Sequence, residues 1–206
     1  MSNFLPQKKI CIVCEGYEEF DYITRLKSCN VWNPIYSVTA KNVQSIDNIA
    51  AVYQNEFQND NHDLVIVFCD TEVEPYRQFK LLCDKIDKFH NRKIAKDIVF
   101  FANPCTMQII LSHFRKVSMD TNSKSKNAKL IMQLTGVAEY VAKKEQRNAI
   151  NRQIDSQNYI QMKTNILSLG ADYKTCPSTN FLKLLENLES SNPSWVKQLA
   201  KKIEKD

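Results

Sequence analysis

The sequence predicts an α/β fold in which a parallel sheet core, flanked by helices, is followed by a helical carboxyl-terminal region. Two apolar, β-branched runs, at residues 10–14 and 64–69, have the composition of strands that are buried on both faces. Segments with helical apolar spacing alternate with these and other short strands, which is the pattern of a parallel sheet with right-handed crossovers. We therefore expect an α/β core over residues 7–115 and a helical region over residues 116–206.

Helical apolar spacing is clear at residues 18–29, where Phe20, Ile23 and Leu26 fall on one face. Acidic residues open this segment and basic residues close it, as the helix dipole favours. Pro75 suits the first turn of a later helix, because a first-turn N–H has no partner within the helix in any case. The expected strands cover residues 10–14, 34–40, 63–69 and 97–102, and the expected helices of the core cover residues 18–29, 45–57 and 75–89.

The second half of the chain has helical apolar spacing and no convincing strand. Gly170 is a natural stop after one helix, and Ser178 with Thr179 suits the N-cap of the next. The expected helices of this half cover residues 128–144, 152–169, 178–190 and 193–205.

The composition is that of an ordinary globular protein, with 43% hydrophobic and 25% charged residues. No run approaches the roughly 18 apolar residues of a membrane-spanning helix, and residues 1–9 lack the apolar core of a secretory signal. We expect a cytoplasmic protein that does not bind membranes. The seven cysteines favour reduced thiols, since their number is odd and several lie in apolar strands. Cys11 and Cys14 form a CxxC, but alternation along a strand separates their side chains, which argues against a shared zinc or redox site.

Acidic residues follow two of the expected strands. Glu15 follows the first strand, and Asp70 and Glu72 follow the third. Because the carboxyl ends of parallel strands form one edge of a sheet, these three carboxylates can share a pocket. Crowded carboxylates repel one another unless a cation lies among them, and Mg²⁺ or Mn²⁺ matches oxygen ligands. The alternative, in which Glu15 caps the next helix and the other two acids lie in a solvated turn, stays open at this point.

A polar, basic segment without periodicity follows the core at residues 114–129 and predicts a mobile loop. Its basic side chains suit contact with a phosphate backbone, and the formal net charge of +5 permits a nucleic-acid partner without requiring one. A plain connector is the alternative. The candidate nucleic-acid-binding residues are Arg115, Lys116, Lys124, Lys126 and Lys129.

Four ordered pieces of the chain resemble the RloB-like proteins, a bacterial family with a TOPRIM-type core, over nearly the whole length. These pieces are Glu15-Gly16 after a strand, the acidic residues 70–72 after a later strand, Ala102-Asn103-Pro104-Cys105 leading to His113-Phe114, and residues 176–179. The resemblance implies a TOPRIM-like core in which Glu15 acts in acid/base chemistry while Asp70 and Glu72 bind magnesium, with Glu74 as a further oxygen donor. It also implies a metal-dependent nuclease that cleaves phosphodiester bonds of DNA or RNA in phage defence or restriction.

Two departures from these family patterns favour a different interpretation. Glu72 stands where TOPRIM domains usually have aspartate, and Met107 stands where RloB-like proteins usually have glutamate. The alternative is a catalytically weakened binding module that acts as a nucleic-acid clamp or as the sensor partner of another defence protein. A phosphotransfer receiver fits less well, because glycine rather than a second acid follows Glu15 and no lysine follows Ala102.

Three more residues are candidates for the site. His113 is a candidate catalytic residue, although a histidine after an apolar helical stretch is usually a packing residue. Gly16 and Asn103 are expected to line the pocket, because both follow strands at its edge. The sequence does not distinguish DNA from RNA, and it leaves a homo-oligomer open.

Overall fold

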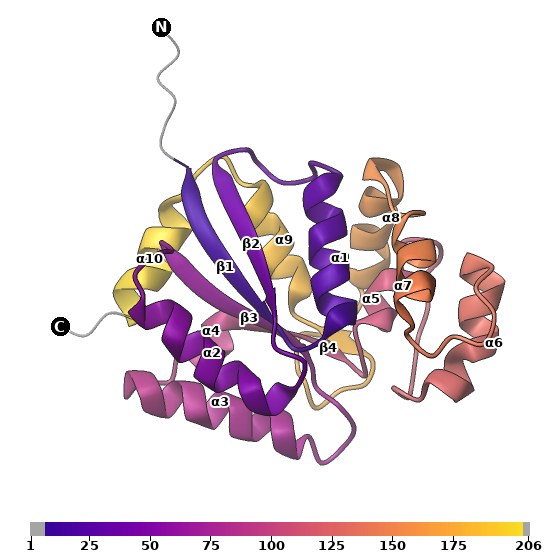
Figure 1. Cartoon of the computed structure of the whole chain (residues 1–206), viewed down its shortest axis with the longest axis horizontal. Coiled ribbons are helices and arrows are strands. Elements are labelled where there is room, and N and C mark those ends of the chain that lie inside the picture. The colour runs from indigo at the N-terminus through magenta and orange to yellow at the C-terminus, as the bar shows by residue number, and fades with distance from the viewer. Residues whose placement is uncertain (1–6, 204–206) are drawn as a thin grey trace, which may run out of the picture.

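A five-stranded sheet with helices on both faces forms the centre of the computed structural model, which describes residues 7–203 (Figure 1). The strand order is β2-β1-β3-β4-β5; the first four strands in the chain run parallel, and β5 runs antiparallel to β4. The predicted α/β fold with its parallel sheet core is therefore confirmed. The strands are β1 (Lys8–Cys14), β2 (Tyr36–Asn42), β3 (Leu64–Asp70), β4 (Val99–Asn103) and β5 (Ser178–Thr179).

The order of the strands reverses between β1 and β3. From β1 the chain crosses to β2 on one side, and it then returns past β1 to form β3 on the other side. Cys14 of β1 pairs with Phe68 of β3, so these two neighbouring strands end together. In parallel α/β sheets ligands bind outside the carboxyl ends of the strands at such a reversal. The topology thus points to the residues that follow β1 and β3.

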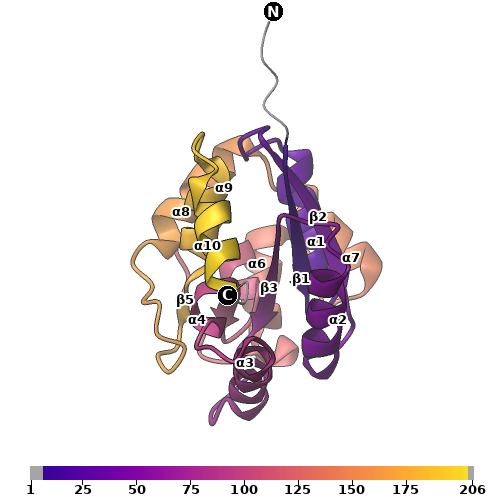
Figure 2. The ribbon, with the colours of Figure 1, turned by 90° about the vertical axis from the view of Figure 1, so that its left-hand side faces the viewer.

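Helices cover both faces of this sheet. Helix α1 (Tyr17–Ser28) and helix α9 (Phe181–Glu189) pack together through Tyr22 and Phe181, and the Phe181 ring stacks on Phe68 of β3 with centroids 4.5 Å apart. Helix α2 (Ile46–Gln58) and helix α3 (Arg77–His90) lie side by side on the other face (Figure 1). Figure 2 shows α9 on the side of the sheet opposite to α3. The remaining helices are α4 (Ala95–Ile98), α5 (Met107–Leu111), α6 (Lys124–Thr135), α7 (Lys144–Asn151), α8 (Ser156–Ile166) and α10 (Ser194–Ile203).

Several expected boundaries differ from the structure. Helix α3 begins after Pro75 and Tyr76, because Tyr76 has a left-handed backbone with φ of 57° that cannot continue into a helix. Ser178 and Thr179 form the edge strand β5, and two residues are too few to give a strand period. Thr179 Oγ1 also accepts a hydrogen bond of 3.0 Å from the Phe181 N–H at the start of α9, so the expected capping contact is present for Thr179. The expected helix 128–144 is interrupted, because α6 ends at Gly136 with its left-handed φ of 73°.

The carboxyl-terminal half does not form a separate helical layer throughout. Helices α5 to α8 lie together beyond α1 (Figure 1), whereas β5 and α9 return to the sheet beside β4. A single hydrophobic core joins both halves, from Ile10 of β1 to Met162 of α8 and Phe181 of α9. The expected boundary at residue 115 therefore separates two stretches of sequence that share one core.

No helix in residues 7–203 is long and apolar enough to cross a membrane. Within these residues the expected helix 193–205 is present as α10, while its last two residues lie outside the described part of the chain, as do residues 1–6 of the expected amino-terminal segment.

Candidate active site

Glu15 and Asp70 meet at the carboxyl ends of β1 and β3. The Glu15 N–H donates to Phe68 O at 3.2 Å, so the β1–β3 ladder continues one residue past β1. The Glu15 Oε2 atom in turn accepts a hydrogen bond of 3.0 Å from the Asp70 N–H. Glu15 is therefore held against β3, and it does not cap the helix that follows it.

Glu19 takes the capping position at the start of α1. Its Oε2 atom accepts a hydrogen bond of 2.9 Å from the Gly16 N–H, and its side chain is almost completely buried. A glutamate three residues into a helix commonly reaches back to the N-cap in this way. The helix thus brings a further buried carboxylate next to Glu15.

Asp70 and Glu72 are each fixed by one partner from the segments after β4 and α5. Thr106 donates twice to Asp70 Oδ1, from its N–H at 2.7 Å and from Oγ1 at 2.8 Å. Asn122 Nδ2 donates to Glu72 Oε2 at 2.7 Å. Among residues 7–203, Asp70 Oδ2, Glu15 Oε1 and Glu72 Oε1 accept no hydrogen bond and remain available to a ligand. Asp70 therefore lies at the end of β3 and not in a solvated turn, whereas Glu72 lies half-buried in the connection that follows β3.

These acids line one cavity of about 460 Å³, which we call the carboxylate cavity. Its volume is within the range of small-molecule and cofactor sites. The residues that line it come from the ends of β1 and β3, the first turn of α1, the connection before α2 and the segments near α6 and α7. Its acidic lining residues are Glu15, Glu18, Glu19, Asp70 and Glu72, and its basic ones are Lys124 and Arg147.

The crowding of acids changes their protonation. Burial, then the Glu19, Glu72 and Glu18 carboxylates, raise the pKa of Glu15 to about 8, although the hydrogen bond from Asp70 N–H opposes this. Burial, followed by the charges of Glu19 and Glu15, raises the pKa of Asp70 well above its ordinary value. Burial also raises the pKa of Glu19. The cavity therefore favours either bound protons or a bound cation.

Two basic side chains lie at the rim of the carboxylate cavity. Lys124 Nζ lies 3.1 Å from Glu18 Oε2, and the other oxygen of Glu18 accepts a hydrogen bond of 2.7 Å from the Tyr140 hydroxyl. Burial disfavours the charged form of Lys124, but the attraction of Glu18 outweighs it and raises the pKa of Lys124. Arg147 pairs with Asp21 at 2.7 Å and stacks over the Tyr17 ring. Both cations are thus positioned beside the acids by partners of their own.

A smaller cavity of about 110 Å³ adjoins the first and shares Asp70 and Glu72 with it. Met107, at the start of α5, and Cys105 line this smaller cavity. Met107 therefore lies beside Asp70 and Glu72, at the position where the resemblance leads us to expect a glutamate.

The donor atoms at the carboxylate cavity are oxygens, which suits a hard cation such as Mg²⁺ or Mn²⁺. Among residues 7–203, no three of these carboxylates bring ligand oxygens within 4.8 Å of one another. That spacing does not form a closed protein cage, but magnesium usually keeps several waters and binds one or two carboxylates. The residues present therefore fit a partly hydrated magnesium ion.

Three of the residues predicted to act in catalysis, bind metal or line the pocket do not line either cavity. His113 is buried, with Nε2 2.9 Å from the Tyr22 hydroxyl and Nδ1 2.9 Å from Asn158 Oδ1, and burial lowers its pKa to about 4. It is placed as a packing residue between α1 and α8. Asn103 is also buried and donates to the backbone of Tyr173 and Thr175. Glu74 is exposed outside the cavities.

The predicted basic residues separate into two groups. The segment expected as a loop to residue 129 becomes helix α6 at Lys124, because Ser123 caps the helix by accepting from the Lys126 N–H. All five basic side chains are exposed, and among them only Lys124 also lines the carboxylate cavity. The other four are Arg115, Lys116, Lys126 and Lys129.

Sequence patterns alone did not identify several residues of this site. Glu18 and Glu19 had the signal of first-turn acids, which suggested only a favourable helix dipole. Thr106, Tyr140 and Arg147 reach the site through contacts distant in sequence and had no local signal. Comparisons of the chain with family models, with curated proteins and with solved structures found no match.

Proposed function

We propose that this chain is a metal-dependent nuclease that hydrolyses phosphodiester bonds of DNA or RNA. One observation carries the proposal: Glu15, Asp70 and Glu72, which arrive from the ends of two neighbouring strands, line one cavity with Lys124 and Arg147 at its rim. Hydrolysis of a phosphodiester needs carboxylates that bind a cation, next to positively charged side chains that bind the phosphate. The four sequence pieces that resemble RloB-like proteins support the same activity in a TOPRIM-like core, in restriction or phage defence.

Asp70 and Glu72 are the residues that would hold Mg²⁺ or Mn²⁺. Each has one oxygen fixed by a hydrogen bond, from Thr106 or Asn122, and another oxygen available. Such fixed partners orient a ligand and are part of the design of a metal site. When bound, the cation would polarise the phosphodiester and stabilise the charge on its leaving oxygen.

Glu15 is the candidate acid/base residue. Its pKa of about 8 lets the side chain hold a proton near neutral pH and exchange it with water or with a departing oxygen. The hydrogen bond from Asp70 N–H fixes the Oε2 atom beside the residues that would hold the metal. Lys124 and Arg147 would neutralise phosphate charge at the rim of the cavity.

The experiment is cleavage of single-stranded DNA, double-stranded DNA and total RNA with Mg²⁺, with Mn²⁺ and with a chelator. We expect metal-dependent cleavage that Glu15→Gln abolishes. Glu74→Gln is the matched control, because Glu74 is an exposed carboxylate in the connection after β3 that lies outside the cavity. Equal cleavage by wild type and Glu15→Gln would refute the role of Glu15, and absence of cleavage with either metal would refute the nuclease.

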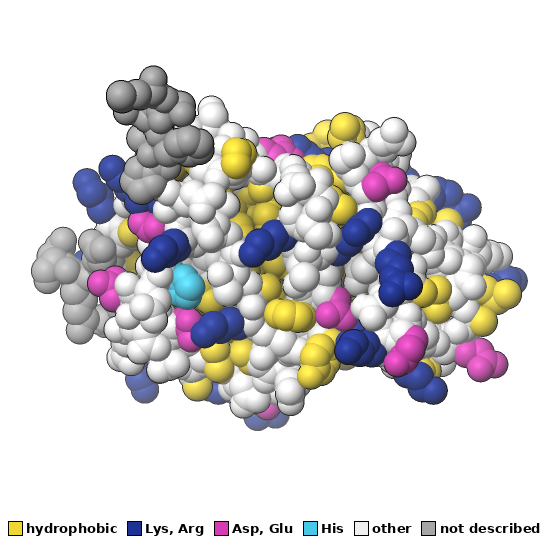
Figure 3. All heavy atoms as spheres, turned by 45° about the horizontal axis from the view of Figure 1, so that its top comes forward, with side chains coloured by type: hydrophobic (Ala, Val, Ile, Leu, Met, Phe, Trp, Pro, Cys, Tyr) yellow, Lys and Arg dark blue, Asp and Glu magenta, His cyan; other side chains and the backbone are white. Residues whose placement is uncertain are grey.

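Met107 favours a second candidate, a catalytically weakened binding module that acts as a nucleic-acid clamp or sensor partner. Its thioether lines the cavity beside Asp70 and Glu72, where a carboxylate would strengthen cation binding. On the face drawn in Figure 3, lysine and arginine side chains are spread over the surface with acidic ones between them. This module would bind nucleic acid in a salt-dependent manner without cleavage, and its affinity would not depend on Glu15.

A further inference from the structure

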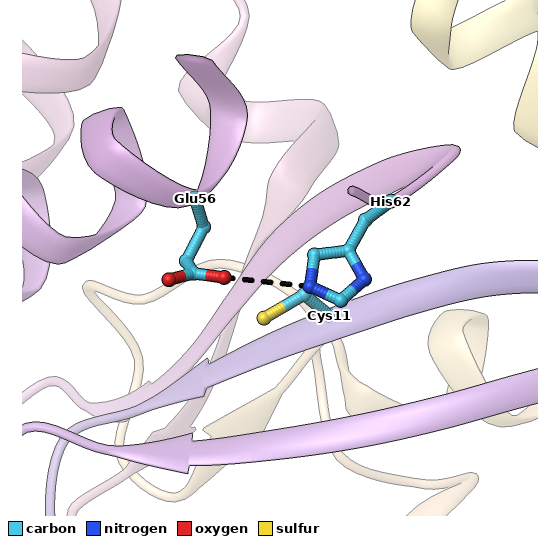
Figure 4. A group of neighbouring side chains, drawn as sticks. All are labelled: Cys11, Glu56 and His62. Atoms are coloured by element: carbon cyan, nitrogen blue, oxygen red, sulfur yellow. Dashed lines mark ion pairs between the residues drawn. The ribbon is translucent and has the colours of Figure 1, made fainter. Parts of the chain in front are cut away.

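We propose that Cys11, Glu56 and His62 form a binding site for a zinc-like transition-metal ion, separate from the carboxylate cavity. The three side chains come from β1, from the last turns of α2 and from the connection between α2 and β3 (Figure 4). Their sulfur, oxygen and nitrogen ligand atoms all lie within 4.8 Å of one another. Thiolate, carboxylate and imidazole are the three ligand types of protein zinc sites.

The spacing of two of these ligands already matches a tetrahedral site. His62 Nε2 lies 3.3 Å from Glu56 Oε2. Two ligands that are each about 2.0–2.1 Å from a tetrahedral zinc ion lie about 3.3 Å apart. The Cys11 sulfur turns toward the same carboxylate (Figure 4), so small side-chain adjustments suffice for a third bond. A water molecule can complete the fourth position.

The surroundings of the cluster support a bound ion. Lys41 Nζ contacts Oε1 of Glu56, the oxygen that does not face His62, and thereby orients the carboxylate from outside as second partners of metal ligands do. Glu56 is almost completely buried, whereas the His62 side chain is 14% exposed and offers a path for the ion. The thiols of Cys14 and Cys69 contact backbone carbonyls, but within residues 7–203 the buried Cys11 thiol has no such partner.

The position of the cluster separates it from the carboxylate cavity. Glu56 lies near the carboxyl end of α2, and His62 lies just before β3 begins, so the cluster lies toward the amino-terminal edge of the sheet. The carboxylate cavity lies at the opposite edge. A bound ion would tie β1 to α2 and to the start of β3. Cys14 takes no part, because it faces the other side of β1, as the alternation along the strand predicted.

The test uses the full chain, stripped with a chelator and then titrated with Zn²⁺ or Co²⁺. We expect one equivalent of either metal to bind at Cys11, Glu56 and His62 and to raise the melting temperature, and Co²⁺ bound there to give the near-ultraviolet charge-transfer absorption of a cobalt thiolate. Binding releases the thiol proton to solvent as the metal–sulfur bond forms. Cys11→Ser should abolish this absorption and weaken zinc binding more than tenfold.

Controls separate this site from the others. Cys14→Ser and Cys105→Ser should retain the absorption, since Cys14 faces away and Cys105 lies at the smaller cavity next to Asp70. Glu15→Gln should also retain it, so the outcome is independent of the proposed nuclease. His62→Gln tests the cluster through a partly exposed residue, in case Cys11→Ser does not fold. An absorption that is missing in wild type, or unchanged in both Cys11→Ser and His62→Gln, would overturn the proposal.

Discussion

The Asp70 N–H donates a hydrogen bond of 3.0 Å to Oε2 of Glu15, which joins the acid at the end of β1 to the acid at the end of β3. The parallel register sets this contact, because Cys14 of β1 is paired with Phe68 of β3. Glu15 comes directly after Cys14, and Asp70 comes two residues after Phe68. One hydrogen bond therefore fixes the geometry of the site before any ligand binds. It also holds two buried carboxylates near each other, and this has consequences for stability.

We predict that the metal-free chain loses stability as the pH rises from about 6.5 to about 8.5. A carboxyl whose pKa is higher in the folded chain than in the unfolded chain binds its proton more tightly when folded, so the free energy of unfolding falls with pH between the two values. For Glu15 these are the ordinary 4.5 and about 8. The fall in this window is about 2 kcal/mol, measured by denaturant unfolding in the presence of a chelator.

The pH range from about 6.5 to about 8.5 lies above the range in which His113 has the opposite effect on the free energy of unfolding. The pKa of this buried histidine is lowered from 6.5 to about 4, so its contribution to stability increases with pH only below about 6.5. Glu15→Gln should reduce the slope above pH 6.5, because the amide does not titrate. An equally steep slope in the variant would contradict the assignment to Glu15.

We predict that Asp70→Asn leaves the melting temperature of the metal-free chain unchanged or higher while it abolishes cleavage. Burial and the neighbouring acids raise the pKa of Asp70, so the charged form is disfavoured in the folded chain. The asparagine oxygen can still accept both hydrogen bonds from Thr106. The gain should be up to about 1–2 kcal/mol, measured by thermal unfolding at pH 8 together with the cleavage assay.

Asp87→Asn is the matched control for this variant. Asp87 also accepts two backbone hydrogen bonds, from Ile94 and Ala95, but it pairs with Lys93 and has no acidic cavity around it. This control should lose stability slightly and keep its cleavage activity. A clear drop in the melting temperature of Asp70→Asn would show that the burial of Asp70 and its repulsion by neighbouring carboxylates destabilise the folded chain less than its other contacts stabilise it.

The order of strands and helices was predictable because their patterns are local. Each of the first four strands lies within a few residues of its expected position, since β1, β3 and β4 are mostly apolar runs and the edge strand β2 alternates between buried and less buried residues. The edge strand β5 was not predictable: it has two residues, and its pairing with β4 joins positions that are far apart in the sequence. The helical start at Lys124 was not predictable either, because its cap, Ser123, lies in a run of small polar residues.

The site was only partly predictable for the same reason. Glu15, Asp70 and Glu72 could be placed together because strand ends share an edge of a parallel sheet, which is a rule of topology. His113 and Asn103 also follow regular elements, but their side chains are saturated by distant partners that no local pattern reveals. Glu18 and Glu19 lie in the first turn of α1, where acidic residues occur both when they cap a helix and when they line a site, so the sequence pattern could not distinguish the two roles.

We predict that nucleic-acid affinity depends on the exposed lysines Lys126 and Lys129 of α6. Lys126 and Lys129 face solvent, whereas Lys124 is already paired with Glu18. Binding to duplex DNA weakens with salt, and the slope of the logarithm of the binding constant against the logarithm of the salt concentration measures this dependence. Replacing both exposed lysines with alanine should make this slope shallower by about 0.9 for each phosphate that is no longer neutralised. Fluorescence anisotropy between about 50 and 200 mM salt measures this slope.

Lys197→Ala serves as the control for surface charge, because Lys197 is exposed on α10, far from α6 (Figure 1). It should leave the slope unchanged. If the α6 double variant and the Lys197 variant have the same slope as wild type, α6 does not bind nucleic acid.

We predict that Met107→Glu increases the response of the chain to Mg²⁺, on the basis of the proposed nuclease site. Met107 is 3% exposed and lines the smaller cavity beside Asp70 and Glu72. A carboxylate there adds repulsion when no metal is bound, so the melting temperature of the metal-free variant should fall by a few degrees, which corresponds to about 1–2 kcal/mol. Mg²⁺ should then raise the melting temperature more than in wild type and increase cleavage.

Met107→Gln separates charge from shape in this experiment. Glutamine has nearly the same size as glutamate and can offer an amide oxygen, but it adds no negative charge to the cavity. It should give a small Mg²⁺ response, close to that of wild type. Equal Mg²⁺-dependent shifts in the glutamate and glutamine variants would mean that Asp70 and Glu72 do not hold the cation near Met107, because an added charge close to a bound divalent ion must strengthen its binding.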